Sequence, residues 1–301
     1  MKRILVTGSN GLLGQKITDL ILETSRVQLI ATSKGADRHP RKGQYTYAEL
    51  DIANEEQILE VVSKYKPEVI INTAAMTNVD ACEKEKDLCR ILNVEAVKYL
   101  ANVSGQNNIH LIHLSTDFVF DGEAGPYDEE AIPNPLSYYG ESKLEAENIL
   151  KASACRWAIL RTIIVYGIVK DMSRSNIVLW AKGALEKGSP INVVNDQWRM
   201  PTLAEDLAEC CLLTAEKEAT GVFNASGKDM MSIIELVEQV ADFYHLDKSL
   251  INPISSDSLN QDAKRPKKTG FILDKSRQVL GYNPHSFKEG MKIMERQLRE
   301  V

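Results

Sequence analysis

The sequence lacks several features that would assign it at once to a class of protein. No apolar run approaches the ~18 residues that a membrane-spanning helix needs. The apolar stretch that follows Met1-Lys2-Arg3 is too short for a signal peptide, so we expect a first strand there. The 301 residues carry a formal net charge of -6, which argues against a nucleic-acid partner. We therefore expect a cytoplasmic protein that binds neither a membrane nor nucleic acid.

Cysteine and histidine are also scarce. The five cysteines are an odd number and no two have C-x-x-C spacing, which indicates neither a disulfide framework nor a zinc site. The five histidines are scattered along the chain. His110 and His113 lie three apart on one predicted strand and so point to opposite faces. The sequence therefore predicts reduced thiols and no metal site.

The first half of the chain alternates short apolar runs with amphipathic stretches. Apolar residues recur at helical spacing over 12–21, 58–62 and 92–100. Because strands that are apolar on both faces alternate with helices, the pattern predicts an α/β fold, a doubly wound parallel (Rossmann) sheet covered on both sides. The predicted strands are Arg3–Thr7, Val27–Thr32, Tyr45–Leu50, Val69–Asn72, Ile109–Ser115 and Ala158–Ile164.

After residue 166 the alternation becomes less regular. We expect a dinucleotide-binding unit over 1–166 and a smaller, mainly substrate-binding lobe over 167–301, with parts of 195–230 returning to the first unit. Such a lobe would cover the carboxyl ends of the strands, where open α/β sheets bind ligands. Helices are predicted at Ser175–Glu186, Leu203–Glu216, Ile233–Tyr244 and Phe287–Glu300, and short strands at Ile191–Val194 and Gly221–Asn224.

A glycine-rich turn joins the first predicted strand to the first helix. Its G-x-x-G-x-x-G spacing suits a tight turn, close approach of the backbone to a diphosphate, and helix-to-strand contact. The start of the helix adds free N–H groups and a partial positive charge. A glycine turn without a ligand is the plain alternative, but the strand-turn-helix context favours a nicotinamide dinucleotide. The expected contacts are Gly8, Asn10, Gly11, Leu12, Leu13 and Gly14.

The segment after the second strand decides between the two nicotinamide cofactors. An acid directly at the strand end would hold the adenosine 2′-hydroxyl. Here Ser33, Lys34 and Arg38 can hold a 2′-phosphate instead, so NADP(H) is favoured, while Asp37 keeps NAD(H) possible. Later segments are expected to flank the adenine and the sugar-phosphate path: Asp51, Ile52, Ala74, Ala75 and Met76.

Tyr139 and Lys143 stand four residues apart at the start of a predicted helix. Positions four apart lie ~40° apart around the helix axis, so the two side chains share a face. A neighbouring ammonium favours the phenolate and lowers the pKa of the tyrosine. Tyr139 is therefore expected to exchange a proton with a carbonyl oxygen, with Lys143 tuning it and also bonding the nicotinamide ribose. By itself, this spacing favours an ordinary surface pair, and the glycine turn reverses that preference.

Polar residues follow the fifth predicted strand at the same edge of the sheet. Thr116 is the expected second donor to the substrate carbonyl, and Ser115 is the alternative. The pocket for the substrate is expected to include Asp117 and Phe118. Arg199 and Arg265 are expected to neutralise a diphosphate there, although either can equally be a surface charge.

With these pieces in place, the chain resembles the extended short-chain dehydrogenase/reductases, and within them the dTDP-4-dehydrorhamnose reductase family. The resemblance implies reduction of a nucleotide-sugar 4-ketone with NADPH or NADH, and Thr116, Tyr139 and Lys143 as the catalytic trio. The segments that carry it are Ile71–Ala75, Asn78–Glu83, Ser115–Asp117, Val119–Gly122, Tyr139–Leu144, Asn195–Gln197 and Pro201–Thr202.

Three positions depart from that family. Phe118 stands where a tyrosine is usual, and Ile164 where a sugar-stacking tryptophan is usual. Lys16 occupies a place where some members carry a glutamate that binds magnesium between subunits. A homodimer is compatible with the sequence, but a metal-bridged one is not expected.

Two other functions are compatible with the same fold. The regulatory subunit of methionine adenosyltransferase is similar in sequence, and the 199–202 segment and Ile164 look closer to it. That resemblance implies a cofactor-binding protein with little turnover. A nucleotide-sugar epimerase or dehydratase is the third alternative, but dehydratases need an extra base after Thr-Asp, where Phe118 cannot serve.

Overall fold

A seven-stranded parallel sheet forms the larger part of the molecule. The computed structural model describes residues 1–24, 27–170, 175–259 and 261–300. The strand order is β11-β6-β5-β4-β1-β2-β3, so the Rossmann prediction is confirmed. The predicted strands of this sheet at 69–72 and 221–224 coincide with the observed ones, and its others differ by one or two residues at their ends. The strands are β1 Lys2–Thr7, β2 Val27–Ser33, β3 Thr46–Glu49, β4 Val69–Asn72, β5 His110–Thr116, β6 Arg156–Thr162 and β11 Gly221–Asn224.

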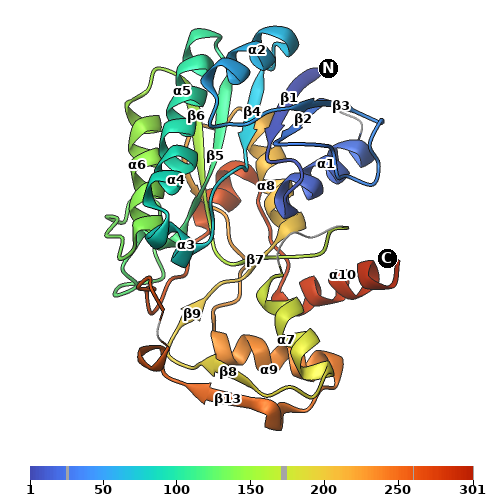
Figure 1. Cartoon of the computed structure of the whole chain (residues 1–301), viewed down its shortest axis with the longest axis vertical. Coiled ribbons are helices and arrows are strands. Elements are labelled where there is room, and N and C mark those ends of the chain that lie inside the picture. The colour runs from blue at the N-terminus through green and yellow to red at the C-terminus, as the bar shows by residue number, and fades with distance from the viewer. Residues whose placement is uncertain (25–26, 171–174, 260, 301) are drawn as a thin grey trace.

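Helices cover both faces of this sheet (Figure 1). Side chains alternate between faces along a strand, so Ile4 and Val6 pack toward α1 and α8, while Leu5 packs toward the opposite side. Each layer buries a continuous apolar cluster that holds its helices against the strands. On one face lie α1 (Leu12–Thr24) and α8 (Ala204–Glu216); on the other lie α2 (Glu55–Tyr65), α5 (Ala96–Gln106) and α6 (Tyr138–Ala152).

The order of the strands fixes where a ligand can lie. From β1 the chain adds β2 and β3 on one side, and then β4, β5, β6 and β11 on the other. The loops that leave β1 and β4 therefore diverge at their carboxyl ends and open a crevice. Short helical elements follow these strands: α3 (Val79–Lys84), α4 (Lys86–Arg90) and a π-helical turn η1 (Ile91–Glu95) after β4, and a 3-10 turn η2 (Asp117–Val119) after β5.

A smaller lobe lies beyond the carboxyl ends of the strands (Figure 1). Its helices are α7 (Ile177–Glu186), α9 (Ile233–Tyr244) and α10 (Phe287–Glu300). The Asn176 side chain accepts from Leu179 N and caps α7, so this helix begins two residues later than predicted. Three two-stranded pairs complete the lobe: β7 (Val165–Tyr166) with β10 (Thr202–Leu203), β9 (Trp198–Arg199) with β12 (Met231–Ser232), and β8 (Ile191–Val194) with β13 (Ile251–Ile254).

The chain crosses between the two parts more than once. After β10 it returns to the sheet, where α8 packs on α1 and β11 pairs with β6. The last segments of the chain hold short turns at η3 (Lys248–Leu250), η4 (Ser256–Ser258) and η5 (Ser276–Leu280). Within the described ranges, no helix is both long and apolar enough to span a membrane.

Candidate active site

A cavity of about 720 Å³ lies where the loops after β1, β4 and β5 meet the smaller lobe. The sheet supplies its inner wall and the lobe supplies its outer wall. Both the glycine turn and the Tyr139–Lys143 face of α6 open into it. Its lining includes Asn10, Gly11, Leu12, Leu13, Gly14, Ala75, Thr116, Asp117, Phe118, Tyr139, Lys143, Ile164, Val169, Ser175, Asn176, Gln197, Arg199, Ile233 and Arg265.

The glycine turn has a shape that side chains would block. Gly8 has φ 66°, and a Cβ there would lie 2.9 Å from Ala74 Cα. A Cβ on Gly14 would collide with Gly8 O. The backbone of the turn is therefore bare where it meets the cavity, and the first N–H groups of α1 have no partner within the helix. This cradle fits the diphosphate of a dinucleotide.

Asn10 joins the glycine turn to the loop after β2. Its Nδ2 donates to Ala36 O at 2.9 Å, and its Oδ1 accepts from Arg38 N at 2.9 Å. Ser33 ends β2, and Lys34 and Arg38 are exposed. These residues do not line the main cavity, but Asn10 brings their loop beside its glycine end.

The other predicted cofactor contacts have different surroundings. Asp51 forms an ion pair with Lys34, whose Nζ lies 2.7 Å from Asp51 Oδ2. Ile52 is buried. Gly8, Ala74 and Met76 are absent from the described lining of the cavity, whereas Ala75 lies in it.

Tyr139 and Lys143 reach the cavity from the first turns of α6. The helix begins after Ser137, whose hydroxyl accepts from Gly140 N. Both side chains are buried: Tyr139 is 8% exposed and Lys143 is 2% exposed. The Phe118 ring meets the Tyr139 ring edge-on, at 5.7 Å between centroids, and shields the phenol from solvent.

The pKa of Tyr139 is raised above its ordinary value, whereas the sequence argument predicted that it is lowered. Burial raises the pKa of the phenol, a hydrogen bond with Thr116 opposes the rise, and the Asp117 charge adds to it. Burial also lowers the pKa of Lys143 to about 8. The sequence argument counted the charge of Lys143 and left out desolvation, which is the larger effect here. Tyr139 is consequently a protonated phenol at neutral pH.

The hydroxyls at the end of β5 separate into two roles. Ser115 also lines the cavity, but its Oγ is already engaged, since it donates to Glu147 Oε1 at 2.7 Å. Thr116 Oγ1 lies in the cavity lining, where it donates to Asp117 Oδ1 at 3.2 Å and accepts from Phe118 N. Thr116 is thus the hydroxyl within reach of a ligand beside Tyr139.

Arg199 lies at the cavity, but its guanidinium is already engaged by the protein. Its NH2 group donates to Pro266 O at 2.6 Å, and its Nε lies 3.5 Å from Asp117 Oδ2. Thr269 Oγ1 also donates to Asp117. In this structure the arginine neutralises a buried carboxylate, and its contact with a diphosphate stays a prediction.

Arg265 has a partner on the opposite side of the cavity. Its NH2 group lies 2.7 Å from Asp80 Oδ2, and Asp80 Oδ1 also accepts from Ala263 N. Beside it, Lys84 Nζ lies 2.8 Å from Asp262 Oδ2. These ion pairs join the loop of the smaller lobe to α3, so Arg265 is half-buried rather than a free surface charge.

Two buried polar residues escaped the sequence argument. His113 Nε2 lies 3.0 Å from Lys143 Nζ. Asn93 bonds the backbone of Met76 and the hydroxyl of Ser142, and it lies in η1, a π-turn of the kind that is frequent at functional sites. A signal existed for His113: it is two residues before Ser115, on the strand face that meets α6.

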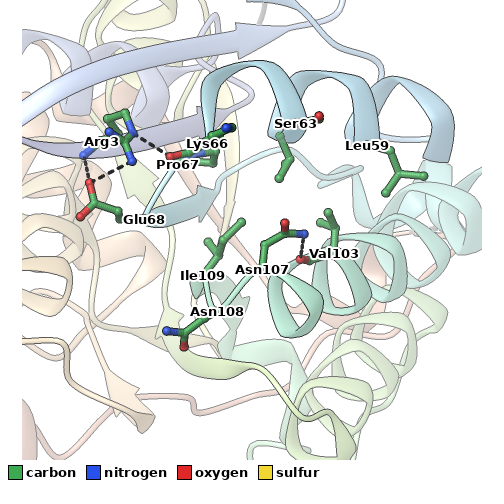
Figure 2. A pocket seen from close by; sticks show the side chains of 11 residues that line it. Arg3, Leu59, Ser63, Lys66, Pro67, Glu68, Val103, Asn107, Asn108 and Ile109 are labelled. Carbon is green, nitrogen blue, oxygen red and sulfur yellow. Dashed lines mark hydrogen bonds and ion pairs between the residues drawn. The ribbon is translucent and has the colours of Figure 1, made fainter.

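Two other kinds of site, a metal centre and a second hollow, are weaker candidates for the active site. The described residues include no cluster of three or more metal-ligating side chains, and the Lys16 ammonium lies 2.9 Å from Glu205 Oε1. A second hollow of about 630 Å³ opens at the amino ends of the strands (Figure 2). There Arg3 donates to Lys66 O and pairs with Glu68, and no histidine, cysteine or tyrosine is among the residues that line it. The first cavity is therefore the candidate active site.

Two relatives and one solved structure are similar to this chain over nearly its whole length. A dTDP-4-dehydrorhamnose reductase of Aggregatibacter actinomycetemcomitans is 31% identical over 304 residues, covering 97% of this chain and 98% of its own. The methionine adenosyltransferase 2 subunit beta of Bos taurus is 31% identical over 298 residues, covering 97% and 86%. The solved dTDP-4-dehydrorhamnose reductase of Bacillus anthracis, in complex with NADP, superimposes with a TM-score of 0.83 at 27% identity, covering 99% and 100%. The model of the RmlD substrate binding domain matches residues 1–300, and the chain belongs to that family.

Proposed function

We propose that this protein is an NADPH-dependent reductase of a nucleotide-activated 4-keto-6-deoxysugar, of the short-chain dehydrogenase/reductase type. One observation carries the proposal. Tyr139, Lys143 and Thr116 line the same cavity as the bare glycine turn, so an acid and a dinucleotide cradle serve one ligand space. The NADP complex of the Bacillus anthracis relative supports the choice of cofactor, and NADH is the second choice.

In this proposal each of the three side chains has a separate task. Bound NADPH supplies the hydride. The neutral Tyr139 phenol donates its proton to the ketone oxygen, and its raised pKa keeps that proton available at neutral pH. The Thr116 hydroxyl turns from Asp117 to the same oxygen. Lys143 bonds the ribose and stabilises the phenolate that forms.

The site residues that we propose divide along the cavity. Gly8 shapes the phosphate turn, while Asn10, Gly11, Leu12, Leu13 and Gly14 contact the dinucleotide directly. Ser33, Lys34 and Arg38 select the 2′-phosphate. Phe118, Asp117 and Arg265 border the sugar nucleotide on the far side of Tyr139. The unit that holds the cofactor is 1–166 together with parts of 195–230, and the rest of 167–301 is mainly the substrate lobe.

The test is NADPH oxidation by the purified protein with a panel of dTDP-, GDP- and UDP-linked 4-keto-6-deoxysugars. We expect loss of NADPH absorbance with at least one sugar, and a product with a hydroxyl at C4. If no sugar of the panel supports NADPH oxidation, the proposal is contradicted. A Tyr139→Phe sample measured in parallel identifies oxidation that comes from a contaminating enzyme.

A second function is supported by the similarity to the methionine adenosyltransferase 2 subunit beta. Ile164 lines the cavity, and its aliphatic side chain cannot stack on a sugar as a tryptophan there would. A regulator would bind NADP(H) without turnover and co-purify with an adenosyltransferase. Pull-down of that enzyme from the native host, together with an inactive sugar panel, would favour this second function.

The cellular setting follows from the same proposal. The five cysteines are buried and outside any disulfide, which supports a reducing compartment, and we infer the cytoplasm. For a homodimer we infer no bridging metal at Lys16, because its ammonium pairs with Glu205 of the same chain. Light scattering at several protein concentrations, with and without a chelator, measures both properties.

A further inference from the structure

A chain of buried hydrogen bonds reaches Lys143 from behind. His113 on β5 is 1% exposed, and its Nε2 lies 3.0 Å from Lys143 Nζ. Its Nδ1 lies 3.1 Å from Nδ2 of Asn72, the last residue of β4. Asn72 Oδ1 accepts from Thr7 Oγ1 at 2.6 Å, and Thr7 directly precedes the glycine turn. The chain thus joins β1, β4, β5 and α6.

The hydrogen atoms of this chain follow a definite order. Because Thr7 donates to Asn72 Oδ1, the amide nitrogen of Asn72 faces His113, and Nδ1 of the imidazole has to accept. A neutral imidazole with a bare Nδ1 carries its hydrogen on Nε2. That hydrogen points at Lys143 Nζ, which can accept it only as an uncharged amine.

A reverse order also connects Asn72, His113 and Lys143, and in it Thr7 Oγ1 accepts from Asn72 Nδ2. When the Asn72 amide turns over, its Oδ1 accepts from a hydrogen on His113 Nδ1, and Nε2 is left as an acceptor. The Lys143 ammonium then donates to Nε2. The chain therefore has two polarities, and they correspond to the two charge states of the lysine.

We propose that His113 is a positioning residue for Lys143: its neutral ring fixes the place of the amine, and the polarity of the Thr7–Asn72–His113 chain follows the charge that Lys143 presents to the cavity. The inference rests on the proposed function, because it gives the reductase a device that holds the residue expected to bind the ribose. It adds a residue that neither the spacing of α6 nor the lining of the cavity identifies.

The surroundings of Lys143 make both charge states accessible. Burial lowers the pKa of Lys143 to about 8, whereas Glu147 on α6, Cys89 on α4 and Cys82 on α3 oppose this effect. Burial and the lysine charge together hold the pKa of His113 well below its ordinary value. His113 consequently stays neutral, and the proton that comes and goes belongs to Lys143.

Two substitutions separate positioning from plain packing. The amide of a His113→Gln side chain reaches the place of the ring Nε2 and can still bond Lys143. The shorter His113→Asn side chain ends near the place of Nδ1 and keeps only the bond to Asn72. Both remove the ring, so both lose similar apolar contact.

The first measurement is NADPH affinity from about pH 6 to about pH 10, by cofactor fluorescence. We expect His113→Asn to weaken binding about tenfold and to move the midpoint of its pH dependence by about one unit, and His113→Gln to stay within about threefold of the unsubstituted protein. Equal affinities and equal midpoints in the two variants would overturn the inference, as would losses that merely follow their melting temperatures.

The second measurement needs neither cofactor nor substrate. In protein with 15N-labelled histidine, His113 is assigned by the signal that disappears in His113→Gln. We expect the His113 ring to stay neutral from about pH 5 to about pH 9 and its Nε2 shift to move in Lys143→Met. An Nε2 shift unaffected by Lys143→Met would overturn the inference. Should the unsubstituted protein bind no NADPH, the proposed function fails, while this measurement still decides the role of His113.

Discussion

Arg199 Nε lies 3.5 Å from Asp117 Oδ2, and the two side chains are 2% and 3% exposed beside the hydroxyl of Thr116. Burial raises the pKa of the Asp117 carboxyl, while the charge of Arg199 and the hydroxyl of Thr269 oppose that rise. The remaining donors of Arg199 bond the backbone carbonyls of Trp198, Pro266 and Lys267. The pair therefore fastens the loop of the smaller lobe to the end of β5.

Removal of Arg199 should destabilise the protein, because Asp117 then remains as a buried charge without its partner. We expect Arg199→Met to lower the free energy of unfolding by about 3–5 kcal/mol, because it leaves the Asp117 carboxylate buried without a counter-charge. The double variant with Asp117→Asn should recover part of that loss. Urea unfolding of both variants measures it, and a double variant no more stable than Arg199→Met would contradict the pairing.

Tyr139 is the proposed acid, and the neighbouring Tyr138 provides a matched control. Tyr139→Phe should reduce kcat by about 10²–10⁴-fold and leave NADPH affinity nearly unchanged, since the phenyl ring keeps its contact with Phe118. Tyr138 precedes it on α6 but is absent from the cavity lining, and Lys86 lies over its ring. Tyr138→Phe should keep normal turnover. Near-normal kcat for Tyr139→Phe would remove the phenol from the mechanism.

Arg265 is the cation best placed to meet the substrate's diphosphate, once it exchanges Asp80 for the ligand. Arg265→Ala should raise KM for the sugar nucleotide about tenfold with a smaller effect on kcat, because the charge-assisted bond forms on binding. Arg277→Ala removes an exposed arginine that pairs only with nearby Asp274 and serves as the control. Steady-state kinetics at saturating NADPH compare them, and equal KM values would exclude Arg265 from the pocket.

The choice between the cofactors should depend on Lys34. It is exposed and pairs with Asp51, so its ammonium is free to exchange that partner for a 2′-phosphate. We expect Lys34→Ala to weaken NADPH binding about fivefold and to leave NADH binding unchanged, which is the size of an exposed ion pair. Lys42→Ala removes the same charge elsewhere in the exposed surface. Equal losses for both cofactors would show that Lys34 does not read the phosphate.

The fold was predictable because its signals are local. The alternation of buried strands with amphipathic helices occupies short stretches, and the G-x-x-G-x-x-G spacing lies within one turn. Tyr139 and Lys143 share a helix, so their common face follows from its pitch. These features need no knowledge of distant segments.

The sequence could not identify side-chain partners that are distant along the chain. Arg199 meets Asp117, and Arg265 meets Asp80, only after the lobe folds over the sheet. The direction of the Tyr139 pKa shift was wrong for a related reason. Spacing identifies a neighbouring charge, but the extent of burial depends on the packing of Phe118 and α6, which no local pattern reports.

His110, the first residue of β5, makes the stability of the protein depend on pH in a predictable direction. It is 1% exposed, and burial, assisted by the charge of Arg156, lowers its pKa to about 4. In the unfolded chain the same group titrates near pH 6.5. Between these two values the unfolded chain binds a proton that the folded protein refuses, so acidification favours unfolding.

We therefore expect the free energy of unfolding to fall by up to about 3 kcal/mol as pH drops from about 6.5 to about 4, through this histidine alone. In His110→Gln that part of the pH dependence should disappear, whatever the variant's stability at neutral pH. His245→Gln, at an exposed helix end, should keep the full slope. Urea unfolding across the window measures all three proteins. A slope in His110→Gln equal to that of the unsubstituted protein would mean that other groups cause the acid sensitivity.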